Sequence, residues 1–126
     1  MGQTVAYVRV STQGQVEFSP AAQAKRCREL TRLRDLGAVT VLSDEGWSGK
    51  NLERPAMREL LSLVESGTGS HIVTWSLDRL SRDRGDCALL VQVFQRHGVT
   101  LHSVTRAARE LPGLRELMQR PSPFAE

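Results

Sequence analysis

The run TVAYVRV, residues 4–10, is the stretch that decides the fold. It is short, apolar and rich in β-branched side chains, and it ends in the polar segment STQGQVEFS, residues 11–19. A continuous apolar run of this kind is typical of a strand that is buried on both faces, as in a parallel sheet. The sequence therefore predicts a strand buried on both faces, with polar side chains at its carboxyl end.

Helical and strand-like segments alternate after this run. Ser19 followed by Pro20 is a typical helix start, and we expect a helix from Pro20 to about Leu36, stopped by Gly37. We expect three more strands, at residues 39–42, 71–77 and 99–104, and two more helices between them. This order predicts an α/β fold of three layers, with a mainly parallel sheet of four to five strands and helices on both faces.

Apolar side chains with helical spacing indicate the inner face of each helix. The expected inner residues are Ala24, Cys27, Leu30 and Leu33 in the first helix, Met57, Leu60, Leu61 and Val64 in the second, and Cys87, Leu90, Val91 and Phe94 in the third.

Composition limits the classes of protein to consider. The 126 residues suffice for one domain, and no apolar run is long enough to span a membrane. Seventeen basic residues against 14 acidic ones give a net charge of +3, which permits a polyanionic partner without requiring one. We interpret Cys27 and Cys87 as free thiols of a cytoplasmic protein.

Polar side chains gather where two of the expected strands end. Arg9 and Ser11 lie at the end of the first strand, and Asp78, Arg79 and Arg82 follow the third. Ligands of parallel α/β sheets bind outside the carboxyl ends of the strands. We therefore place the candidate site at this edge.

A serine among arginines favours phosphoryl transfer. Acyl transfer would need a base such as histidine, and His71, His97 and His102 are not placed near Ser11 by the strand pattern. The G-x-S-x-G motif of serine hydrolases is also absent. Guanidinium groups bind phosphate oxygens and stabilise the charge that develops in the transition state.

A metal site is the alternative at the same edge. Asp44, Glu45 and Asp78 could in principle hold one Mg²⁺, but the surplus of arginine beside Asp78 counts against this. A phosphate-binding loop with Lys-Ser or Lys-Thr is absent. We expect no metal and no cofactor.

Three motifs resemble those of the serine recombinase catalytic domain, the family of resolvases, invertases and large serine integrases. They are YVRVST at residues 7–12, DEGWSGKNLERP at residues 44–55 and LDRLSRD at residues 77–83. The resemblance extends over roughly residues 3–105. It implies a resolvase-like fold and a role in site-specific DNA recombination and integration.

The resemblance also implies catalytic roles. Ser11 would attack a DNA phosphodiester and form a 5′-phosphoserine intermediate, which keeps the bond energy for rejoining. Arg9, Arg79 and Arg82 would bind the scissile phosphate, and Asp78 would orient these arginines. Arg54 matches the arginine that contacts the phosphate from another side. Gln15 and Gln23 match polar positions that support the loop of the nucleophile.

The last expectations concern domains and partners. We expect the catalytic domain at residues 1–105 and a short tail or truncated dimerisation helix at residues 106–126. The chain carries neither a helix-turn-helix nor a set of zinc-ligating cysteines, so we expect activity to need a DNA-binding region outside it. In that full-length context the partners would be DNA and further copies of the protein, as homodimers that pair into a tetramer. Two alternatives stay open, namely a regulatory module that pairs with a full-length recombinase and a metal-dependent nuclease of similar fold.

Overall fold

The computed structural model describes residues 2–10, 19–47 and 52–106, and it has the expected α/β architecture. Four strands form one sheet in the order β2-β1-β3-β4, and every pair is parallel. The strands are β1 (Gln3–Val10), β2 (Val39–Glu45), β3 (Gly69–Thr74) and β4 (Thr100–Ser103). The prediction of a mainly parallel sheet is confirmed, and the strand order places β1 in the interior of the sheet.

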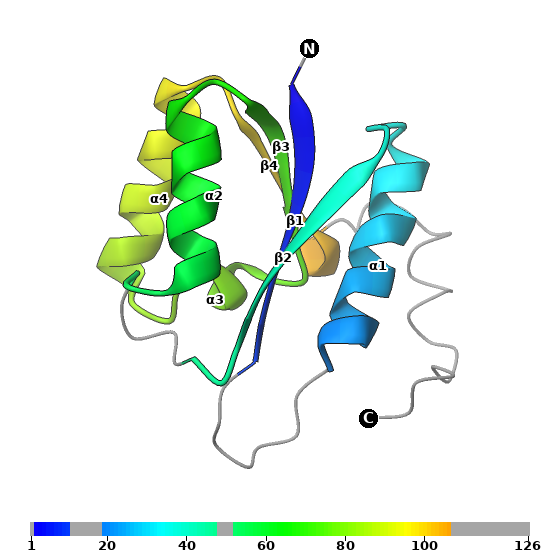
Figure 1. Cartoon of the computed structure of the whole chain (residues 1–126), viewed down its shortest axis with the longest axis horizontal. Helices are drawn as coiled ribbons and strands as arrows, with labels where there is room; N and C mark the ends of the chain where they lie inside the picture. The colour runs from blue at the N-terminus through cyan, green and yellow to red at the C-terminus, as the bar shows by residue number, and fades with distance from the viewer. Residues whose placement is uncertain (1, 11–18, 48–51, 107–126) are drawn as a thin grey trace.

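Helices cover both faces of the sheet. Helix α1 (Pro20–Leu33) lies on one face, and α2 (Pro55–Glu65) and α4 (Arg84–Arg96) lie on the other (Figure 1). The short helix α3 (Leu77–Leu80) lies near the carboxyl ends of the strands. The three layers agree with the fold predicted from the alternation of elements.

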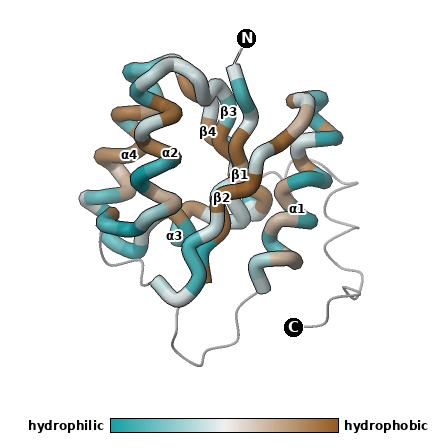
Figure 2. The backbone as a smooth tube through the Cα atoms, in the orientation of Figure 1, coloured by the Kyte–Doolittle hydropathy of each residue, from teal (hydrophilic) through white to brown (hydrophobic). Residues whose placement is uncertain are grey.

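Strand β1 supplies side chains to two apolar cores because successive residues of a strand point to opposite faces. Val5 and Tyr7 pack with Met57, Leu60 and Phe94 on the side of α2 and α4. On the opposite side, Ala6 joins a smaller cluster that also contains Val73, Cys27 and Leu30. Figure 2 shows the hydrophobic residues gathered on the strands and on the helix surfaces that face them.

The predicted carboxyl end of the third strand is wrong. We predicted a strand through Leu77, but β3 ends at Thr74 and Leu77 begins α3. The chain curls here because the main-chain carbonyls of Asp78 and Arg79 turn back to accept hydrogen bonds from Arg9. The curl places the predicted Asp-Arg pair on a short helix beside the end of β1.

The first helix is shorter than predicted. Helix α1 begins at Pro20 with Ser19 as its N-cap, as expected, but it ends at Leu33. Leu33 is 52% exposed, so its assignment to the inner face is wrong. Leu36, beyond the end of the helix, packs against the apolar cluster instead. The main-chain N–H of Leu36 donates to the carbonyl of Thr31, which turns the chain back towards the sheet.

The other two long helices match their apolar patterns closely. Helix α2 buries Met57, Leu60 and Val64, and α4 buries Leu90 and Phe94. Cys27 is buried and Cys87 half-buried, and both are free thiols as predicted. Within the described ranges, every helix is too short or too polar to cross a lipid bilayer.

Candidate active site at the carboxyl ends of the strands

Arg9 lies at the centre of the candidate site and is fully buried. Its guanidinium donates from Nε to the carbonyl of Arg79 at 3.0 Å and from Nη2 to the carbonyl of Asp78 at 2.8 Å. A third bond runs from Nη1 to the carbonyl of Trp47 at 3.2 Å. One side chain thus joins β1 to α3 and to the segment after β2.

Gln23 holds the backbone of Arg9 from the opposite side of the sheet. The main-chain N–H of Arg9 donates to Oε1 of Gln23 at 3.4 Å, and Nε2 of Gln23 donates to the carbonyl of Arg9 at 3.1 Å. Gln23 is fully buried near the start of α1. This pair of bonds fixes the chain two residues before Ser11, at the position where the sequence placed a supporting glutamine.

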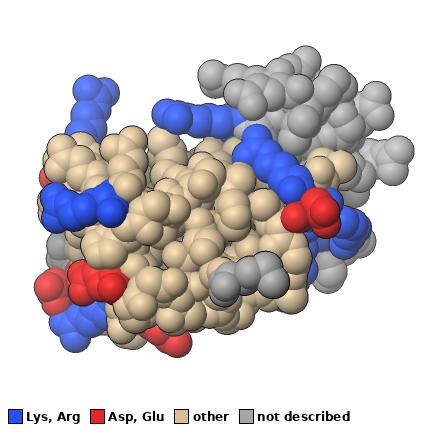
Figure 3. Space-filling model, turned by 90° about the horizontal axis from the view of Figure 1, so that it is seen from above, with Lys and Arg blue, Asp and Glu red and all other residues tan. Residues whose placement is uncertain are grey.

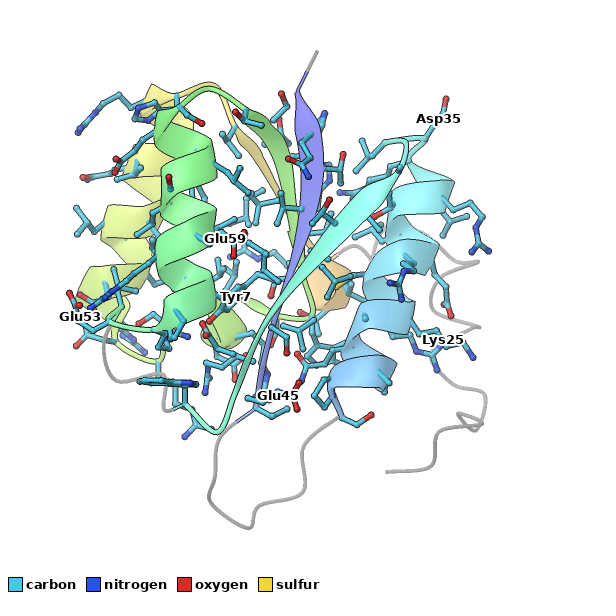
Figure 4. All side chains as sticks on the ribbon, in the orientation of Figure 1. Tyr7, Lys25, Asp35, Glu45, Glu53 and Glu59 are labelled. Atoms are coloured by element: carbon cyan, nitrogen blue, oxygen red, sulfur yellow. The ribbon has the colours of Figure 1, made fainter. Side chains whose placement is uncertain are left out.

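Arg54 is also buried, at 1% exposure, and belongs to a second network. Its Nη1 donates to the Tyr7 hydroxyl at 2.8 Å, and its Nη2 donates to the carbonyl of Leu80. The Tyr7 hydroxyl in turn donates to Oδ2 of Asp44 at 2.6 Å. Burial and the hydrogen bond to Asp44 raise the pKa of Tyr7, so this hydroxyl keeps its proton. Figure 4 shows Tyr7 on the side of the sheet covered by α2.

Asp44 caps helix α2 from outside that helix. Its carboxylate accepts the main-chain N–H groups of Ala56 at 2.9 Å and Met57 at 3.1 Å. Arg54, the residue at the N-cap position, makes no capping bond with its side chain. Sequence reasoning missed these roles of Tyr7 and Asp44, although a polar side chain inside a buried strand is a signal because it must find a partner.

The carboxylates of the metal alternative are not brought together. Asp44 is engaged with α2 and Tyr7, and Asp78 accepts a hydrogen bond from the Ser76 hydroxyl. No group of three or more His, Cys, Asp or Glu side chains able to hold a metal occurs among the described residues. The set of Asp44, Glu45 and Asp78 is therefore not a cluster in this structure.

The three residues predicted after the third strand differ in exposure. The Arg79 side chain is 11% exposed, and its Nη1 donates to the carbonyl of Arg9 at 3.4 Å. The Asp78 side chain is 54% exposed and lies 4.0 Å from Nε of Arg79. Arg82 is exposed. Asp78 and Arg82 therefore lie at the surface, directly beside the buried Arg9.

The four arginines form one field of positive charge. The pKa of Arg9 is lowered by burial and, after that, by the charges of Arg54, Arg79 and Arg82. The described acceptors of the Arg9 guanidinium are neutral carbonyls, which leave its charge uncompensated. Such an edge attracts an anion. The opposite end of the molecule differs, because Figure 3 shows Lys and Arg set singly around the margin of a wide uncharged area.

The structure thus brings together six of the eight predicted site residues, which are Arg9, Gln23, Arg54, Asp78, Arg79 and Arg82. Ser11 and Gln15 lie outside the described residues. Val10, the neighbour of Ser11 in the chain, is the last residue of β1 and pairs with Glu45. The arrangement can attract an anion to the carboxyl end of β1, where Arg79 and Arg82 reach the surface and Arg9 and Arg54 add positive charge from below.

Comparisons of the sequence with known proteins identify the family. Residues 4–121 match the family described as "Resolvase, N terminal domain". The chain is 32% identical over 101 residues to a DNA-invertase of Escherichia phage P1, covering 80% of this chain and 48% of the invertase. It is 33% identical over 103 residues to the transposon Tn21 resolvase of Escherichia coli, covering 82% of this chain and 47% of the resolvase. The chain therefore spans about half the length of these relatives.

Solved structures of catalytic domains have a similar fold. The N-terminal catalytic domain of TP901-1 integrase superposes with a TM-score of 0.70 at 28% identity, covering 93% of this chain and 95% of that domain. The C-terminal catalytic domain of ISC1926 TnpA, an IS607-like serine recombinase, superposes with a TM-score of 0.67 at 25% identity. That match covers 80% of this chain and 66% of the other chain.

Proposed function

Because this chain belongs to the serine recombinase family through its resolvase N-terminal domain, we propose that it cleaves and rejoins DNA with Ser11 as the nucleophile. One observation carries the proposal. Four arginines gather where β1 ends, and Ser11 is the next residue but one after Arg9 in the chain. Clustered guanidinium groups are suited to the charge that develops on a phosphate during transfer.

The proposed step is a transesterification. The Ser11 oxygen attacks the scissile phosphorus, a phosphoserine ester forms, and the bond to the 3′ oxygen breaks. The serine proton is lost and the leaving 3′ oxygen gains a proton. Because one phosphate ester bond replaces another, the step needs no external energy source. The 5′ end of the DNA stays on Ser11, and attack by another 3′-hydroxyl reverses the step. Asp78, exposed beside the arginines, is the group that we propose orients them and exchanges a proton.

The arginines differ in burial, and we assign them different roles towards the phosphate on this basis. Arg82 lies at the surface and Arg79 is partly exposed, so we assign direct phosphate contacts to these two. Arg9 and Arg54 are buried and bonded to main-chain carbonyls of α3. Their charge supports the same phosphate in this arrangement, and direct contact would require the α3 segment to move. Gln23, and by resemblance Gln15, would position the nucleophile.

The partners follow from the same proposal. The substrate is DNA, and no cofactor is needed because the phosphoserine bond conserves the energy of the phosphodiester. We propose that the domain works with a DNA-binding region outside residues 1–105, in homodimers that pair to a tetramer. The short tail or truncated dimerisation helix expected at residues 106–126 lies, apart from Arg106, outside the described residues. The free thiols Cys27 and Cys87 fit action in the cytoplasm.

The burial of Arg9 and Arg54 favours one second candidate. A domain with two of its four arginines enclosed could serve as a regulatory module that pairs with a full-length recombinase. Such a module would inhibit or tune recombination equally well with Ser11→Ala, because its effect would depend on pairing and not on chemistry.

The decisive experiment is covalent trapping. The chain, fused to a DNA-binding module, is incubated without added metal with nicked DNA carrying the site of that module. We expect a protein–DNA adduct on a denaturing gel that is lost with Ser11→Ala. Ser62→Ala, a serine on the exposed side of α2, is the matched control and should trap as well as the unchanged fusion.

Two results would contradict the proposal. A folded, DNA-bound fusion that forms no adduct would move the assignment to the regulatory module. Cleavage that survives Ser11→Ala but stops on chelation of metal would support the metal-dependent nuclease.

A further inference from the structure

A hollow of about 400 Å³ lies where α3 meets the start of α4, on the outer side of the candidate site. It shares Asp78 and Arg82 with that site. Its lining residues are Leu77, Asp78, Ser81, Arg82, Asp83, Arg84 and Cys87. A hollow that opens beside the reacting phosphate is placed to receive the part of the substrate next to it.

Arg82 and Arg84 are the cationic residues of the lining, which also contains Asp78 and Asp83. Arg82 and Arg84 are both exposed. Within the described part of the chain, the Arg84 side chain makes no hydrogen bond and no ion pair, so its guanidinium is available to an anion. Asp83, the single residue between them, is extended, which sets the Cα atoms of Arg82 and Arg84 at most about 7 Å apart. One guanidinium can therefore reach the scissile phosphate while the other reaches its neighbour.

The two carboxylates in the hollow are already engaged. Oδ1 of Asp83 accepts the main-chain N–H of Asp86 at 2.9 Å and caps helix α4. Oδ1 of Asp78 accepts the Ser76 hydroxyl, which leaves its second oxygen towards solvent-exposed space. Asp83 lies at the positive end of the α4 dipole, which offsets part of the charge of its carboxylate. Asp78 keeps an acceptor for a sugar hydroxyl or for the leaving oxygen.

The remaining wall of the hollow is apolar. Leu77 and Cys87 are both half-buried and line it from α3 and α4. Charged groups on one side and an apolar wall on the other suit a sugar–phosphate unit better than a simple anion, because deoxyribose has apolar carbon surface.

We propose that this hollow is a subsite for the nucleotide that flanks the scissile phosphate, with Arg84 binding the flanking phosphate and Leu77 and Cys87 contacting the sugar. The inference rests on the proposed function, since it assumes that DNA lies across the carboxyl ends of the strands. It adds Arg84 and Cys87 to the residues that contact substrate.

Cys87 provides a chemical reporter for the subsite. The other cysteine, Cys27, is fully buried, and burial raises its pKa to about 12, so its reactive thiolate is scarce. A maleimide should therefore label the folded chain at Cys87 alone, and Cys87→Ser should abolish labelling. The labelling rate then measures whether the hollow is occupied.

The test uses the unfused 126-residue chain at low ionic strength, where phosphate contacts are strongest. Binding of a duplex is followed by fluorescence anisotropy, and Cys87 labelling is measured at saturation. We expect DNA to slow labelling at least fivefold and added salt to restore the rate. Inorganic phosphate at the same ionic strength should leave the rate unchanged. An unchanged rate on bound DNA, equal protection by phosphate, or no binding of the duplex would overturn the proposal.

Arg84→Gln tests the contact itself. We expect the variant to bind DNA severalfold more weakly and to lower the slope of log affinity against log salt by about 1. Arg96→Gln, at the exposed far end of the same helix, is the matched control and should behave as the unchanged chain. Equal behaviour of the two variants would overturn the role of Arg84.

Failure of the subsite can be told apart from failure of the proposed function. If trapping depends on Ser11 but bound DNA does not protect Cys87, the proposed subsite is wrong and the proposed recombinase chemistry is retained. Absence of trapping in the fusion would remove the chemistry on which the subsite rests.

Discussion

Each end of the sheet contains an arginine that ties a helix or loop to the strands, but the arginines at the carboxyl end are buried, Arg34 at the amino end is half-buried, and the acceptors differ. At the carboxyl end, Arg9 donates to three main-chain carbonyls and Arg54 donates to Tyr7 and Leu80. At the amino end, Arg34, which follows α1, donates to Nδ1 of His102 at 2.6 Å. The first set of acceptors takes up no proton at neutral or mildly acidic pH, whereas a histidine acceptor can be protonated in acid.

The amino-end network requires both histidines to be neutral. A guanidinium only donates, so Nδ1 of His102 accepts and its proton is on Nε2. That proton is donated to Nδ1 of His71 at 3.0 Å. Burial, followed by the charge of Arg34 and by His71, lowers the pKa of His102 to about 4. The comparison teaches that permanent charge is concentrated at the candidate site, while sensitivity to pH is concentrated at the opposite end.

The largest expected effect comes from removing the charge at the carboxyl end. Arg9→Leu leaves three carbonyls without their donor inside the domain, and we expect a loss of about 4 kcal/mol in the free energy of unfolding. Urea denaturation measures it. Arg58→Leu, at an exposed ion pair with Glu53, should change the stability by less than about 0.5 kcal/mol. A mild effect at Arg9 would show that these bonds do not hold the edge together.

The second effect concerns the cap that Asp44 places on α2. Asp44→Ala removes the acceptor of two helix N–H groups and of the Tyr7 hydroxyl, so we expect a loss of about 3 kcal/mol. Thermal and urea unfolding of the variant give the value. Glu59→Ala, on the exposed side of the same helix, is the control that should stay close to the unchanged chain.

The third effect tests the amino end through pH. The pKa of His102 is about 4 in the folded protein against an ordinary value of 6.5, so the folded state binds fewer protons than the unfolded chain. This contribution to stability is complete above pH 6.5 and is lost as the pH falls towards 4. We expect it to amount to about 2 kcal/mol.

Urea midpoints measured between pH 7.5 and pH 4 provide the test. His102→Asn should show a shallower loss than the unchanged chain, and His97→Gln, an exposed histidine after α4, should retain the full loss. Identical pH profiles for all three proteins would place the pH sensitivity somewhere other than this network.

The smallest effect is at the N-cap of α1, beside the candidate site. The Ser19 hydroxyl accepts the main-chain N–H of Ala22 at 3.1 Å, so Ser19→Ala should cost about 1 kcal/mol. Ser19→Asp should retain most of the stability because aspartate caps equally well. A neutral Ser19→Ala variant would indicate that α1 depends on packing and on the Gln23 bonds alone.

The sequence allowed the alternation of strands and long helices and the burial of the first strand to be predicted, and it suggested where to look for the site. The apolar run 4–10 and the Ser19-Pro20 start carry local signals, so β1 and the beginning of α1 were correct. The short helix α3 could not be predicted, because it depends on the distant guanidinium of Arg9. The capping of α2 by Asp44 also joins residues far apart in sequence. Leu33 was misplaced because it continues the apolar spacing of Leu30, whereas the last turn of α1 leaves its side chain exposed.

In the candidate site, too, some features could be predicted from the sequence and others depend on distant parts of the chain. The strand-end pattern indicated Arg9, Arg79 and Arg82, and the family resemblance added Arg54. The structure brings these four arginines into one electrostatic field. The sequence did not predict that Arg9 and Arg54 would be enclosed, because burial depends on the segments that fold over them.

The central claim is that Ser11 carries the DNA during the reaction. Its most direct test is mass spectrometry of the trapped adduct after digestion of the protein and the DNA. We predict a peptide containing Ser11 that bears a nucleotide through its 5′ phosphate, formed equally well in the presence of a metal chelator. A linkage to another residue, or through a 3′ phosphate, would contradict the account.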